Sequence, residues 1–92
     1  MTSMRARITR PGDVLVRELD GESVLLNLAT ESYFGLDGIG TRMWAVLTSS
    51  PSVEAASETL LLEYDVEPER LRSELRAFVE KLEEAGLVDV SE

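Results

Sequence analysis

The side chains that could carry out covalent chemistry in this sequence are carboxylates, hydroxyls and amines, because its 92 residues include neither cysteine nor histidine. Thiolate nucleophiles, imidazole bases, disulfides and the usual zinc ligands are therefore excluded. A small enzyme that uses paired carboxylates remains an alternative, but nothing in the sequence places two acids in a concave, apolar setting. The residues favour a binding protein over an enzyme, and we expect neither a cofactor nor a metal.

The segment best suited to binding is ESYFGLDGIGTRMWAVL, which runs from Glu31 to Leu47 and holds the single tryptophan of the chain. Its first part, Ser32–Leu36, is predicted to be a strand, and it lacks the lysine or proline that often blunts an exposed sheet edge. Such an edge presents free backbone N–H and C=O groups, to which an extended peptide can add as a further strand. Gly35 weakens an isolated strand, which indicates a bulge or the close approach of another backbone.

Three strands are predicted in the first third of the chain. Asp13–Leu19 and Glu22–Ala29 flank Asp20-Gly21, a dipeptide favoured in tight hairpin turns. A polar turn at Thr30-Glu31 then leads into the third strand at Ser32–Leu36. The pattern is that of an antiparallel meander.

Side chains alternate between the two faces of a strand, so Phe34 and Leu36 share one face and Tyr33 lies on the other. We interpret Phe34 and Leu36 mainly as core residues, which could also form the floor of a shallow groove. The phenol of Tyr33 is open to solvent or ligand.

Three helices are predicted after the strands. The first follows Asp37 as its N-cap and spaces Trp44 as a core anchor, and the second runs from Val53 to about Glu63. The third begins with a proline in its first turn and runs from Pro68 to Ala85. Strands followed by helices in one short chain predict a small α+β domain.

Charge is distributed unevenly along the chain, whose net charge is −9. Three of the nine basic residues, Arg5, Arg7 and Arg10, lie in the first ten positions, so the remainder carries six basic against 18 acidic residues. We expect residues 1–12 to form a basic, flexible tail and residues 13–92 to form the domain. An acidic surface repels phosphate backbones and anionic lipid, which argues against nucleic-acid or membrane partners, although acidity can also serve solubility alone. No apolar run resembles a signal core or a membrane span, and we expect a cytoplasmic protein.

Several segments in order give a more specific indication. VLLNLATESYFGLDGIGTRMWAVL, then LLLEYDV, then LRSELRAFVEKLEEAGLVDV together resemble the PqqD-like family, also called RiPP recognition elements, over roughly Val14 to Val90. Within that family the chain is most similar to the stand-alone leader-binding subunit of lasso-peptide biosynthesis.

The resemblance implies a winged-helix-like fold, with a three-stranded antiparallel sheet followed by a three-helix bundle. It implies that the leader of a ribosomally made precursor peptide adds antiparallel to the third strand, in a groove walled by the third helix. It also implies a separate leader protease, a cysteine protease in this family, as a partner, with an ATP-dependent cyclase as a further candidate.

The peptide-binding residues expected from this resemblance lie on the third strand and the third helix. The third helix carries an apolar stripe, and the sequence leaves open which side, or shoulder, of this stripe faces the groove. The acidic residue usual in the family at the position of Glu74 favours the shoulder that carries Glu74. An exposed helix pair between Arg70 and Glu74 explains the same residues equally well. The expected set is Glu31, Ser32, Tyr33, Phe34, Gly35, Leu36, Arg70, Leu71, Glu74, Leu75, Ala77, Phe78 and Lys81.

The alternative function is a winged-helix transcription regulator, whose third helix would enter the major groove of DNA. That helix carries four cationic side chains against five glutamates between Glu69 and Glu84. A helix with more acidic than basic side chains is poorly suited to bind a phosphate backbone.

Overall fold

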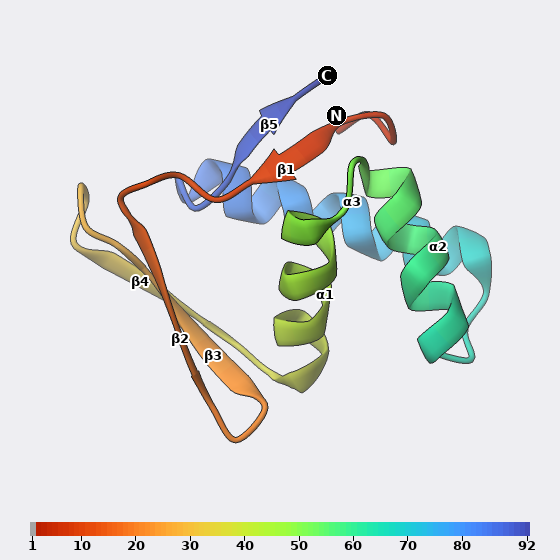
Figure 1. Cartoon of the computed structure of the whole chain (residues 1–92), viewed down its shortest axis with the longest axis horizontal. Coiled ribbons are helices and arrows are strands. Elements are labelled where there is room, and N and C mark those ends of the chain that lie inside the picture. Colours follow the sequence, from red (N-terminus) through yellow and green to blue (C-terminus); the bar gives the residue numbers. More distant parts are fainter. Residues whose placement is uncertain (1) are drawn as a thin grey trace.

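An antiparallel sheet of three strands packs beside three helices in the computed structural model, which describes residues 2–92 (Figure 1). The strands are β2 (Val14–Leu19), β3 (Glu22–Asn27) and β4 (Ser32–Leu36), in the order β2-β3-β4. Asp20 and Gly21 both have positive φ angles, the backbone that a two-residue hairpin turn requires. The predicted meander is confirmed, and it leaves β2 and β4 as the two edges of the sheet.

The helices are α1 (Gly38–Ser49), α2 (Val53–Glu63) and α3 (Pro68–Glu84). The backbone N–H of Gly40 donates to Asp37 Oδ1 at 2.8 Å, so Asp37 caps α1 as predicted. The α+β class, the three-stranded sheet and the three helices agree with the sequence-based prediction. None of the helices in residues 2–92 is long and apolar enough to cross a membrane.

The core lies between the inner face of the sheet and the three helices. Leu25 of β3, Leu47 of α1 and Leu60 of α2 are almost completely buried, as are Leu75 and Leu82 of α3. Trp44 is also buried, which confirms its structural role.

At the surface, Arg42 of α1 donates to Glu63 of α2, with 2.7 Å between Nε and Oε1, and this hydrogen bond lowers the pKa of Glu63.

The N-terminal residues differ from the expected tail. Residues Arg7–Thr9 form β1, which pairs antiparallel with β5 (Asp89–Ser91) where the two termini approach each other (Figure 1). Ala6 and Ile8 are buried in the core. The carbonyl of Ala6 also accepts from the N–H of Val53 at 2.8 Å, at the start of α2.

Residues 2–12 therefore pack on the domain, and the predicted boundary at residue 13 does not divide the structure. Met1, the first residue of that predicted tail, lies outside the described residues. The sequence did not indicate this strand, because only two apolar residues, Ala6 and Ile8, alternate with the arginines there, too few to establish a period of two.

Candidate functional site

The main candidate site is a groove of about 580 Å³ between β4, the first turns of α1, and α3. We call it the β4–α3 groove. The side of the groove formed by β4 and the loop after it consists of Phe34, Gly35, Leu36 and Asp37. The α1 end consists of Ile39, Gly40 and Met43, and the α3 wall consists of Glu74, Ala77, Phe78 and Lys81.

Strand β4 brings an open edge to this groove. It pairs with β3 on one side, and in the sheet formed by residues 14–36 it is the last strand. Leu36 is buried and Phe34 is half-buried against the core, as the alternation predicted. Tyr33 is 78% exposed on the other face. An edge of this kind can accept a further strand through its outward-facing N–H and C=O groups.

The structure resolves which shoulder of α3 faces the groove. Glu74, Ala77, Phe78 and Lys81 lie three or four residues apart, the spacing that puts side chains on one helix face. The 74–81 shoulder is therefore the groove wall.

Several of the residues expected from the sequence lie away from the groove. Leu71 and Leu75 are buried in the core beneath the wall. Glu31, Ser32 and Tyr33 lie on or just before β4, away from the residues that line the hollow. Arg70 is highly exposed and donates from Nε to Glu74 Oε1 at 3.2 Å, which is the surface pair that the spacing also allowed.

The contribution of α1 to the groove was not predicted from the sequence. Ile39 and Met43 have the helical spacing of core residues, but Ile39 is 55% exposed at the groove end while Met43 is buried below it. Gly40 allows close packing here, since a Cβ atom at this position would lie 3.3 Å from Asp37 Oδ1 and 3.4 Å from Leu36. Periodicity gave no signal for this role, because the first turn of a helix can leave the core while keeping its spacing.

The electrostatics of α3 suit a peptide better than a nucleic acid. Besides the pair between Arg70 and Glu74, Arg72 Nη1 lies 2.8 Å from Glu69 Oε1. Both arginines are therefore partly neutralised on the helix itself, which weakens their attraction for phosphates.

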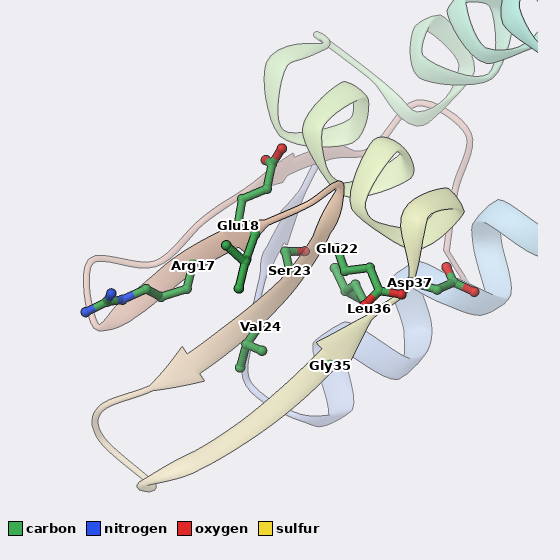
Figure 2. A pocket seen from close by; sticks show the side chains of 9 residues that line it. Arg17, Glu18, Glu22, Ser23, Val24, Gly35, Leu36 and Asp37 are labelled. Atoms are coloured by element: carbon green, nitrogen blue, oxygen red, sulfur yellow. The ribbon is translucent and has the colours of Figure 1, made fainter.

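A second hollow, of about 630 Å³, lies next to the β2–β3 hairpin turn, and residues of β2, β3 and β4 line it (Figure 2). Gly35, Leu36 and Asp37 contribute to both hollows. We call the second one the hairpin pocket. Its remaining lining comes from Arg17, Glu18, Leu19, Glu22, Ser23 and Val24.

A free strand edge beside a groove walled by a helix is the geometry that strand addition requires, and it is typical of small peptide-recognition domains. The family model described as coenzyme PQQ synthesis protein D (PqqD) matches residues 22–88. The chain belongs to the PqqD family, which confirms the resemblance drawn from the sequence.

Two solved structures share the fold. One, TbiB1 in complex with the TbiA(beta) leader peptide, is 32% identical, with a TM-score of 0.83 over 88% of this chain and 94% of that one. The other, a lasso peptide synthetase B1 complexed with the leader peptide, is 24% identical, with a TM-score of 0.78 over 92% of this chain and 98% of that one. No curated protein sequence matches the chain.

Proposed function

We propose that this protein binds the leader segment of a ribosomally synthesised precursor peptide, of the lasso class, by strand addition to β4. The observation that carries the proposal is the open β4 edge beside the β4–α3 groove. The likeness to TbiB1, whose structure contains a leader peptide, supports it across most of both chains.

Affinity and selectivity come from different parts of this site. Main-chain hydrogen bonds along β4 tolerate many leader sequences, whereas the groove selects side chains that point toward α3. An apolar or aromatic anchor, such as the tyrosine frequent in lasso leaders, would lie near Phe34, Met43 and Phe78. A few strand bonds and one or two anchors, less the cost of ordering the leader, give a dissociation constant of about micromolar or somewhat tighter.

The residues expected from the sequence then have three proposed roles. Glu31 to Leu36 provide the docking strand and the groove floor. The groove wall that selects leader side chains consists of Glu74, Ala77, Phe78 and Lys81. Arg70 lies on the same helix face, where it is exposed and paired with Glu74. Leu71 and Leu75 act from the core, since they hold α3 in place and are too buried to contact a peptide.

In this proposal the protein is an adaptor without chemistry of its own. It presents the precursor to a separate cysteine protease that removes the leader, and to an ATP-dependent cyclase that closes the ring. We place this step in the cytoplasm, because the proposed ligand is a newly made ribosomal product.

The test is calorimetric titration of the full chain with a synthetic leader peptide of a lasso precursor from the same genome. We expect saturable binding to that leader and none to a scrambled peptide of the same composition. A mobility-shift assay with random and upstream DNA tests the alternative. Tight, salt-sensitive DNA binding without leader binding would overturn the proposal.

A further inference from the structure

An added strand has two faces, and the β4–α3 groove accounts for only one of them. Side chains alternate along a strand, so every second residue of a leader docked on β4 would point away from α3, onto the outer face of the sheet. Tyr33 and Gly35 are the β4 residues of that outer face, and both are exposed. Arg17, Val24 and Gly35 of this outer face line the hairpin pocket, which also includes Glu18, Ser23 and Leu36 of the inner row (Figure 2).

The strand register places Gly35 at the end of one row of residues. Gly35 pairs with Val24 of β3, and Val24 pairs with Arg17 of β2. Paired residues share a face, so the row across the outer surface is Arg17, Val24 and Gly35. A peptide residue that paired with Gly35 would extend this row by one position.

Gly35 leaves a gap in that row. A Cβ atom built on Gly35 would meet nothing within 4 Å, so the backbone there is uncovered. Beyond it, Val24 is 43% exposed and lines the hairpin pocket. A glycine in a strand has no side chain to pack, and a large side chain on the neighbouring strand can cover it.

We propose that the hairpin pocket is a second specificity subsite, which takes a large apolar or aromatic side chain from the leader residue paired with Gly35. That side chain lies across the backbone of Gly35 and contacts Val24. The inference rests on the proposed function, because it requires a strand docked on β4. It explains why a docking strand contains a glycine: a side chain at position 35 would occupy the space that the leader side chain uses.

The surroundings of the gap define the chemistry of the subsite. Tyr33, two residues away on the same face, borders it on one side with an exposed aromatic ring. The charged residues that line the pocket are three acids, Glu18, Glu22 and Asp37, and one base, Arg17. This net negative charge disfavours a carboxylate on the leader, whereas an aromatic ring could stack against Tyr33.

The test is a display selection of random 12-residue peptides on the wild-type chain and on Gly35→Val. The valine fills the open position with a residue that favours strands, so circular dichroism should show a folded variant. We expect wild-type binders to share one position rich in large apolar or aromatic residues, and Gly35→Val binders to carry small residues there. A wild-type binder made as a synthetic peptide should bind Gly35→Val about tenfold more weakly or worse, while its alanine version at that position binds both proteins alike.

Two further variants separate this subsite from other effects. Gly12→Val also adds a side chain where nothing lies within 4 Å, but in the loop before β2, and it should leave the selected peptides unchanged. Val24→Ala removes the floor of the subsite. It should weaken the large-residue peptide about two- to fivefold and leave the alanine version unaffected.

The outcomes distinguish this inference from the proposed function. Identical preferences in wild type and Gly35→Val, or loss of every peptide by Gly35→Val, would overturn the subsite while leaving strand addition intact. A Val24→Ala effect equal for both peptides would also overturn it. If the wild-type chain selects no peptide at all, the proposed function fails together with the subsite.

Discussion

Phe78 offers the sharpest test of the groove, because its side chain packs against the core and also lines the β4–α3 groove. Truncating a completely buried phenylalanine costs about 3–5 kcal/mol. Phe78 is only partly buried, so we expect Phe78→Ala to lower the free energy of unfolding by about 1–2 kcal/mol. Leader affinity should fall at least about tenfold, some 1.4 kcal/mol, chiefly through faster dissociation.

The assay combines chemical denaturation and calorimetric titration on the same preparation. Leu82→Ala is the matched control, since Leu82 lies one turn further along α3 and is completely buried away from the groove. It should cost about 2–5 kcal/mol of stability and leave the affinity of the folded fraction unchanged.

The comparison of the two variants refutes the reasoning in either of two ways. A stable Phe78→Ala variant with unaltered leader affinity would remove Phe78 from the site. Equal losses of affinity in both variants, at peptide concentrations where both are folded, would show that general loosening of α3 and not the groove wall controls binding.

Three more predictions concern the edge strand, the charge and the helix cap. Gly35→Pro should abolish leader binding while circular dichroism shows a folded chain, because proline removes a backbone donor from the strand; unchanged affinity would mean that β4 is not the docking edge. A lysine-rich leader should bind more tightly at low salt than at high salt, and Glu74→Lys should weaken it further, by up to about fivefold; titrations that give one dissociation constant across the salt range would count against this. Asp37→Ala should lower stability by about 1 kcal/mol in thermal or chemical unfolding, because it removes the acceptor for the N–H of Gly40, whereas Asp37→Asn should retain most of it; equal losses would contradict a capping role.

Local signals predicted most of the fold. The Asp20-Gly21 turn, the Asp37 cap and Pro68 each fix the backbone within a few residues, so the strands and helices they border were predictable within one or two residues. The pairing of β1 with β5 was not, since it joins residues 80 or more positions apart through strands of three residues. Such pairing depends on tertiary contacts that no local pattern records.

The site was predictable where it follows from helix or strand periodicity. The face that carries Glu74 and Phe78 follows from spacing, but the choice between the two shoulders of α3 needed the structure. Ile39 could not be identified, because its spacing fits a core residue and only its three-dimensional position shows it to be exposed. The role of the outer face of the sheet was equally hard to predict. Val24 has the residue type of a core position, but it points to the exposed face of β3, whereas its neighbour Leu25 points into the core.

The most direct measurement of the central claim is amide hydrogen exchange with and without a saturating leader peptide. The sheet has two edges, β4 and β2, so the second serves as an internal control. Strand addition at β4 predicts that amides within Ser32–Leu36 become protected from exchange, while those of Val14–Leu19 keep their rates. Protection at β2, or a saturated complex with no change at β4, would contradict the account.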